Sequence, residues 1–237
     1  MKVESDRYWK MITSISPQSL DNDIVQLQPA TWSDYLTYRD DETQDALKLF
    51  FDKNYLLIEM GREGINHSQF CELLTMLVFA WFSRHPEEKF SLLNRCQLEK
   101  PKTQAAAPDL VLYLGHDYPT WQMGERRYIN LAEFRVPDLV GEVGDTTLAK
   151  DLDEKKHLYA QLGIREYWVI DVRGQRVIAF ILAENGIYQE VDISEALKGL
   201  KISLINQTLQ RLETETNGMA AIWFSQQVAT LLKDNSV

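Results

Sequence analysis

A chain of 237 residues and 27.5 kDa is long enough for one large domain or two small ones, and one is expected for an α/β chain of this length. Its 45% hydrophobic and 25% charged residues are globular averages, which excludes collagen-like, low-complexity and disordered classes. The formal charge of −10 argues against a protein that coats nucleic acid nonspecifically, because such binding needs excess lysine and arginine.

The cysteines and the hydropathy pattern indicate the compartment. Cys71 and Cys96 have no metal-ligand spacing and are too few for a disulfide framework, so a reducing cytoplasm is expected. The longest apolar run, within residues 73–82, is about half as long as a membrane span, and residues 1–10 have no apolar signal core. We therefore expect a soluble, cytoplasmic protein with no membrane partner.

The first part of the chain alternates between polar and apolar segments. Residues 1–40 are polar and are broken by Pro17 and Pro29, so we expect a loosely attached arm there. A short apolar strand is expected over residues 54–60. Residues 68–83 predict a helix that is apolar nearly all round and therefore largely buried.

The middle of the chain is rich in strand signals, bounded by Gly, Pro or Asn. Five strands are expected, over residues 109–114, 139–143, 166–172, 175–182 and 188–193, with a tight turn at Arg173 and Gly174. Residues 148–162 predict a crossover helix that ends at Gly163. Residues 202–232 predict two short helices, separated near Asn217 and Gly218.

This order of elements predicts a mixed α/β fold. We expect a main domain over residues 41–200, preceded by the arm of residues 1–40. Residues 201–237 would form a helical extension packed on the same domain.

The crossover helix carries two charged residues on its apolar face. At 100° per residue, Lys155 shares a face with every large apolar residue of the helix, and Asp151 lies one turn earlier on that face. A buried lysine and aspartate are costly unless they are paired. They could form a structural i,i+4 pair, the lysine head could reach water, or Lys155 could point into an active site.

Two carboxylates stand where strands could bring them to this lysine. Glu142 lies one residue from the carboxyl end of its strand, where ligands of α/β proteins collect, and Asp109 opens another apolar strand. With the backbone carbonyl of Val143, they would offer the hard oxygen ligands that Mg²⁺ or Mn²⁺ prefers. A lysine beside them could orient a water or stabilise charge on a phosphate. Singly these signals are weak, because a strand glutamate is more often an edge or rim residue.

Several motifs of the chain, taken together, resemble one protein family. They are Pro108-Asp109, the run Glu142-Val143-Gly144-Asp145-Thr146-Thr147-Leu148, Asp151 four residues before Lys155, Leu158-Tyr159-Ala160, and GIREYWVID over residues 163–171. This combination resembles the Uma-two family of the restriction-endonuclease-like superfamily, whose signature is PD-(D/E)XK. The resemblance is strong over residues 108–188 and looser over residues 54–83, where Glu59 and His67 fit the family pattern.

The resemblance implies a restriction-endonuclease-like core, with a mixed central sheet flanked by helices, usually in homodimers. It implies an endonuclease that uses Mg²⁺ or Mn²⁺ to hydrolyse phosphodiester bonds of DNA. Asp109, Glu142 and the Val143 carbonyl would be the metal ligands, and Lys155 the catalytic lysine. Glu59 and Asp151 are supporting candidates, as a further metal ligand and as a partner of the lysine.

The chain departs from the simplest superfamily pattern, which places the lysine two residues after the glutamate, because that position is Gly144. In this family the lysine is taken to have moved to the following helix, where Lys155 is the matching position. The helical-face argument leads independently to the same residue. His67 has a plainer interpretation, as a residue that helps to begin its helix.

Two alternatives stand beside the nuclease hypothesis. The fold could be a non-catalytic dimerising or protein-binding module in which Lys155 forms a buried structural pair, or it could hydrolyse a small phosphoester. The acidic excess is concentrated at the ends, with −5 over residues 1–66 and −3 over residues 177–237. The charge therefore predicts weak DNA binding without metal or a partner, rather than excluding a nuclease.

Overall fold

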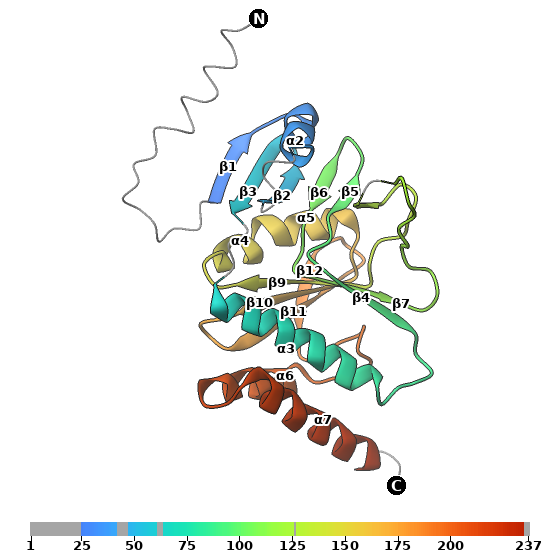
Figure 1. The fold of residues 1–237 in the computed structure, drawn as a ribbon, viewed down its shortest axis with the longest axis vertical. Coiled ribbons are helices and arrows are strands. Elements are labelled where there is room, and N and C mark those ends of the chain that lie inside the picture. The colour runs from blue at the N-terminus through green and yellow to red at the C-terminus, as the bar shows by residue number, and fades with distance from the viewer. Residues whose placement is uncertain (1–24, 42–46, 61–63, 126, 235–237) are drawn as a thin grey trace, which may run out of the picture.

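Two six-stranded sheets organise the chain in the computed structural model, which describes residues 25–41, 47–60, 64–125 and 127–234 (Figure 1). The amino-terminal sheet has the order β1-β3-β2-β6-β5-β8, and the central sheet the order β12-β11-β10-β9-β7-β4. Both are mixed, because β5 and β8 run parallel in one and β9 and β10 run parallel in the other. The expected mixed α/β architecture, with sheets flanked by helices, is confirmed.

The strands of the amino-terminal sheet come mainly from the first half of the chain. They are β1 (Val25–Pro29), β2 (Leu47–Asp52), β3 (Tyr55–Met60), β5 (Leu98–Lys100), β6 (Gln104–Ala106) and β8 (Ile129–Asn130). The hairpin β2–β3 turns at Lys53 and Asn54, which both have positive φ. The hairpin places Lys48 directly opposite Glu59.

The central sheet carries most of the strands that the sequence predicts. Its strands are β4 (Phe90–Asn94), β7 (Leu110–Leu114), β9 (Leu139–Gly144), β10 (Glu166–Asp171), β11 (Arg176–Leu182) and β12 (Tyr188–Val191). The five expected strands are confirmed as β7 and β9–β12, with small differences at their ends. A right-handed crossover is the usual way to join parallel strands, and here two helices connect β9 to β10.

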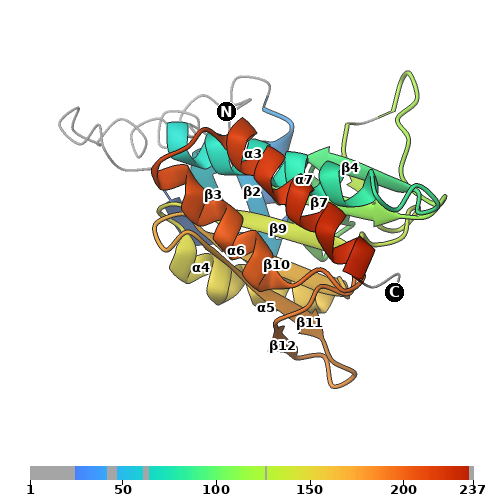
Figure 2. The same ribbon diagram turned by 90° about the horizontal axis from the view of Figure 1, so that it is seen from below.

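Helices cover both faces of the central sheet (Figure 2). The helices α3 (Ile65–Phe82), α6 (Ile202–Gln210) and α7 (Asn217–Asp234) share one hydrophobic cluster with the sheet, and a short 3₁₀ turn (Arg211–Glu213) follows α6. On the other face, α4 (Leu148–Leu152) precedes α5 (Glu154–Leu162), which packs between the two sheets in a second cluster. Glu142 lies on this second face, toward α5.

Helix positions differ from the sequence predictions in three places. The helix expected over 68–83 spans Ile65–Phe82, and it is largely buried as predicted. The prediction of one continuous crossover helix is wrong, because the helix breaks at Asp153, which has φ −122° and ψ −86°. The N–H of Asp153 donates a hydrogen bond to the carbonyl of Lys150 in a tight 3₁₀-type turn. Gly163 ends α5 in the left-handed conformation with φ 80°, as predicted. In the tail, α7 begins at Asn217 but has 18 residues and is not short.

The expected loosely attached arm over residues 1–40 is corrected where the structure describes it. Residues 25–29 pair with β3 along their whole length, and α2 (Trp32–Arg39) packs on the amino-terminal sheet. Tyr35 is fully buried and donates a hydrogen bond to Glu99, to which Arg39 also binds. These contacts come from β5, about sixty residues away, so the local polarity of the segment does not reveal them. Residues 1–24 lie outside the described residues. The expected boundaries of the main domain, at residues 40 and 200, stay predictions.

None of the described helices is long and apolar enough to cross a membrane. Cys71 and Cys96 do not form a disulfide with each other.

Candidate active site

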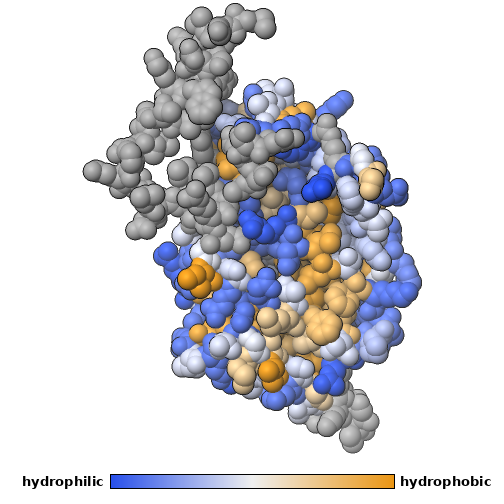
Figure 3. Space-filling view, in the orientation of Figure 1, coloured by the Kyte–Doolittle hydropathy of each residue, from blue (hydrophilic) through white to orange (hydrophobic). Residues whose placement is uncertain are grey.

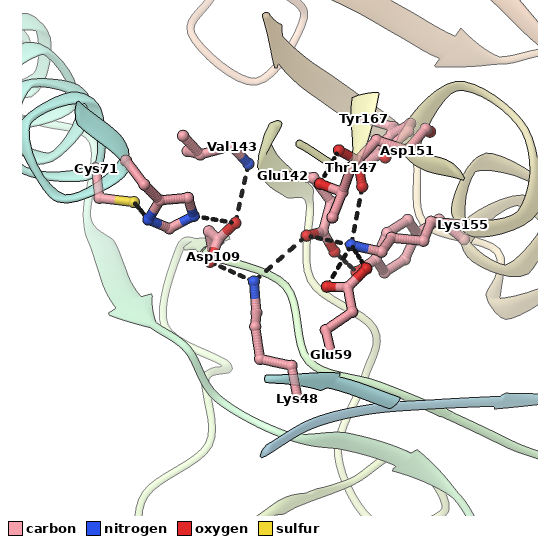
Figure 4. A network of polar contacts seen from close by, with 12 residues as sticks. Lys48, Glu59, Cys71, Asp109, Glu142, Val143, Thr147, Asp151, Lys155 and Tyr167 are labelled. Carbon is pink, nitrogen blue, oxygen red and sulfur yellow. Dashed lines mark hydrogen bonds and ion pairs between the residues drawn. The ribbon is translucent and has the colours of Figure 1, made fainter. Parts of the chain in front are cut away.

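Six charged side chains meet between the β2–β3 hairpin, the central sheet and α4–α5 (Figure 4). We call them the buried charge cluster, and each residue is at most 8% exposed. Its members are Lys48, Glu59, Asp109, Glu142, Asp151 and Lys155. All five side chains that the sequence singles out as catalytic or supporting are therefore brought together, and one further residue, Lys48, joins them.

Strand register brings Asp109 to Glu142. β7 runs antiparallel to β9 and pairs Leu110 with Gly141, so Asp109 comes level with Glu142 one step further. Asp109 Oδ2 accepts a 2.9 Å hydrogen bond from the backbone N–H of Val143, which fixes the carboxylate against β9. The two carboxylates thus reach one place from neighbouring strands, as expected.

Lys155 lies in the centre of three carboxylates. Its Nζ is 2.8 Å from Asp151 Oδ1, 3.0 Å from Glu59 and 3.2 Å from Glu142 Oε2. Because its side chain is only 1% exposed, the ammonium does not reach water, which removes one of the three interpretations of this lysine. The other two share one geometry, because the i,i+4 pair with Asp151 and the contact with Glu142 coexist.

The supporting carboxylates are held by the surrounding helices and strands. Thr147 Oγ1 donates to Asp151 Oδ2 at 2.8 Å, and the Tyr167 hydroxyl donates to the Asp151 carbonyl at 2.8 Å. The second oxygen of Asp151 (Oδ1) and Glu59 Oε1 are buried and accept no hydrogen bond, although both lie near Lys155. Both oxygens therefore face the ammonium of Lys155 as ion-pair partners, and this lysine compensates them.

Lys48 and Tyr159 take part in the site although they were not expected there. Lys48 Nζ lies 2.5 Å from Asp109 Oδ1 and 3.7 Å from Glu142 Oε2. Tyr159 is buried on α5, and its hydroxyl donates to Glu142 Oε1. The sequence signal for Lys48 is a lysine within the apolar run LKLFF, but the sequence analysis predicts no strand over these residues.

His67 has a larger part in the site than the expected helix-start role. It is 9% exposed, and its Nε2 lies 3.3 Å from Asp109 Oδ2, while its Nδ1 lies 3.5 Å from Cys71 Sγ. These three residues are close enough to hold a metal ion between them. The linear spacing of the cysteines could not show this, because the third ligand, Asp109, comes from another part of the chain.

Burial and the two lysines act against each other on the carboxyl groups. Burial raises the pKa of Glu142 to about 7, although the charges of Lys155 and Lys48 pull it down. For Asp109, burial also raises the pKa, but Lys48 and His67 outweigh it and hold the pKa well below its usual range. Burial would lower the pKa of Lys155, but its three carboxylates keep that pKa well above the usual value.

The charge balance of the cluster fits a divalent cation. Four carboxylates and two ammonium groups leave a formal charge of −2 in a place that is almost fully buried when all six are ionised. Buried charge that is not compensated is costly, and one divalent ion would compensate it. The oxygen-rich donor set of Asp109, Glu142 and Glu59 suits Mg²⁺ or Mn²⁺. Val143 contributes its N–H to Asp109, and its carbonyl remains a candidate ligand from the same residue.

A pocket of about 450 Å³ opens beside the cluster, between the β2–β3 hairpin and α5. Lys155 lies in its wall together with Phe50, whose ring centroid is 4.3 Å from the Lys155 ammonium. Tyr55, which is 51% exposed, and Lys53 line its outer part. Of the six members of the cluster, Lys155 is the one that lines this pocket.

The fold and this geometry can be compared with known proteins. The model of the Uma-two family, described as "putative restriction endonuclease", matches residues 32–215. A crystal structure of a "putative nuclease" from Anabaena variabilis superposes with a TM-score of 0.54 at 14% sequence identity, over 76% of this chain and 99% of that chain. At that identity the likeness shows the fold alone. No curated protein matches the sequence.

Proposed function

Because the chain belongs to the Uma-two family, a family of nuclease-like proteins, we propose that it is a divalent-metal-dependent endonuclease that hydrolyses phosphodiester bonds of DNA. The observation that carries the proposal is the buried charge cluster, in which Asp109, Glu142 and Lys155 come together from distant parts of the chain. With all six members ionised, its four carboxylates exceed its two ammonium groups, and a divalent ion would compensate that excess.

Each residue has a distinct part in this proposal. Asp109 and Glu142, with the Val143 carbonyl, would hold Mg²⁺ or Mn²⁺, with Glu59 as a further ligand. Such an ion, when bound, supplies Lewis-acid activation of water and neutralises charge on the phosphate. Lys155 opposes the effect of burial on the pKa of Glu142 and holds the carboxylate in place, and its ammonium lies where it can orient a water or face a phosphate oxygen. Asp151 positions Lys155 from one turn earlier.

The test is a nicking assay on supercoiled plasmid with Mg²⁺ or Mn²⁺. The isosteric variants Asp109→Asn and Glu142→Gln remove one negative charge each, and Lys155→Met removes the cation. Each is expected to lower divalent-dependent nicking by at least about a hundredfold, as loss of a charge-stabilising group usually does. Asp153→Asn, whose side chain is 71% exposed at the break between α4 and α5, is the matched control and should keep full activity.

Other outcomes separate the alternatives. Nicking that survives in Glu142→Gln and Lys155→Met, or that chelators do not stop, contradicts the proposal. Hydrolysis of a chromogenic phosphodiester without any cleavage of DNA would favour a small-phosphoester hydrolase. If millimolar Mg²⁺ or Mn²⁺ leaves the melting temperature unchanged, the fold is better explained as a non-catalytic dimerising or protein-binding module.

We also propose that the protein forms a homodimer in the cytoplasm. The face drawn in Figure 3 carries apolar residues among hydrophilic ones, and α3 and α7 run over the same face in Figure 1. On these helices Ile65, Phe79, Met219 and Ile222 are each more than half exposed. Light scattering on the purified protein tests the dimer, and a monomer at micromolar concentration would contradict it.

A further inference from the structure

Lys48 occupies a place that matters for the proposed metal. Its ammonium lies between the two carboxylates that would hold the ion, 2.5 Å from Asp109 Oδ1 and 3.7 Å from Glu142 Oε2 (Figure 4). Lys155 approaches Glu142 from the other side, with Glu59 and Asp151 around it. The two lysines therefore do different things: Lys155 joins three carboxylates, and Lys48 lies across the proposed ligand pair.

An ammonium and a divalent ion cannot share this place. Both need the oxygens of Asp109 and Glu142 at close range, and their positive charges repel each other strongly in a buried site. The side chain of Lys48 is 10% exposed, whereas that of Lys155 is 1% exposed, so Lys48 is the less deeply buried of the two lysines. Its long, flexible stem allows the ammonium to move without a change in β2.

We propose that Lys48 is an internal cation that holds the place of the divalent ion between Asp109 and Glu142, and that metal binds by displacing it. This inference rests on the proposed function, because it takes these two residues as metal ligands.

Two consequences follow for the protein. Without metal, Lys48 compensates the Asp109 carboxylate and stabilises the fold around the site. With metal, part of the binding free energy is used to move the ammonium, so the site binds the ion more weakly than its carboxylates alone would. The protein then takes up metal only when the concentration of the ion is high enough to compete with its own lysine.

The test measures Mn²⁺ binding by calorimetry, independently of any activity. Lys48→Met keeps the stem but removes the charge, and it is expected to lower the dissociation constant for Mn²⁺ by at least about tenfold. Lys48→Arg keeps a cation in the place and should bind no more tightly than the wild type. Lys53→Met makes the same change in net charge at a side chain that is 69% exposed, and should stay within about twofold of the wild type.

A second measurement needs no variant and so does not depend on the folding of Lys48→Met. The wild-type protein is acetylated briefly, with and without saturating Mn²⁺, and each lysine is quantified by mass spectrometry. Displacement predicts that Mn²⁺ raises the acetylation of Lys48 severalfold and leaves Lys53 unchanged. Equal labelling of Lys48 in both conditions overturns the proposal.

The outcomes also separate this inference from the proposed function. If the wild type binds Mn²⁺ and Lys48→Met binds it no more tightly, the inference about Lys48 is wrong and the metal site stands. If neither protein binds Mn²⁺, the metal site itself is wrong and the inference fails with it. Binding that is detectable only in Lys48→Met supports the inference most directly.

Discussion

Replacing Lys155 with methionine tests how the buried charge cluster is held together. The substitution keeps most of the side-chain volume but leaves Glu59, Glu142 and Asp151 without their common cation. Removing one partner of a buried ion pair costs about 3–5 kcal/mol, because the remaining charges stay buried and uncompensated. In a chain of this size 1 kcal/mol corresponds to about 2–4 °C, so the melting temperature should fall by about 6–20 °C.

Thermal unfolding followed by circular dichroism, in the absence of divalent ions, measures this effect. Lys53→Met, at a side chain that is 69% exposed, is the control and should change the melting temperature by about 1 °C or less. The double variant Glu142→Gln/Lys155→Met should lose less than the sum of the single variants, because it removes a charge of each sign from one contact. A fall of less than about 2 °C for Lys155→Met would refute the reasoning.

Three further predictions concern the neighbours of that lysine. Burial raises the pKa of Glu142 to about 7, so protons compete with the metal for this carboxylate below that pH. The rise in melting temperature that Mn²⁺ causes should therefore be full at pH 8 and fade toward pH 6. Gly144→Ala should destabilise the protein by about 1–3 kcal/mol in urea titrations, because the added Cβ would come within 2.6 Å of Asp151 Oδ2; Gly64→Ala, with open space around it, is the control. Tyr159→Phe should cost about 1–3 kcal/mol in the same titrations by leaving a buried Glu142 oxygen without its donor.

Much of the site could be predicted from the sequence because its signals were local. Asp109 directly precedes an apolar strand and Glu142 lies within another, so each position follows from period-two alternation. Lys155 stands out because a charged residue on an apolar helix face is unusual. The break at Asp153 changes the helix axis, yet Asp151 and Lys155 still meet at 2.8 Å. The face argument was therefore right about the contact although it assumed one continuous helix.

The rest of the site depends on pairings between distant segments, which local patterns do not show. Lys48 enters the cluster because β2 pairs with β3, and that register decides which side chains face the central sheet. The link between His67 and Asp109 joins α3 to the start of β7 in the same way. The polar composition of residues 1–40 predicts a loosely attached arm, and no pattern within that segment reveals the contact of Tyr35 with Glu99.

The position of Gly144 gives a reason why the lysine that we propose for catalysis lies on a helix. The simplest pattern of the superfamily that the sequence resembles would place a lysine there, but any side chain at residue 144 would run into Asp151 Oδ2 and the backbone of Leu148. The space is taken by the carboxylate that pairs with Lys155, so the two arrangements exclude each other. From α5 the ammonium still reaches Glu142 Oε2 at 3.2 Å. What the proposed chemistry requires is a cation at that oxygen, and the fold can supply it from a different element when the strand position is closed.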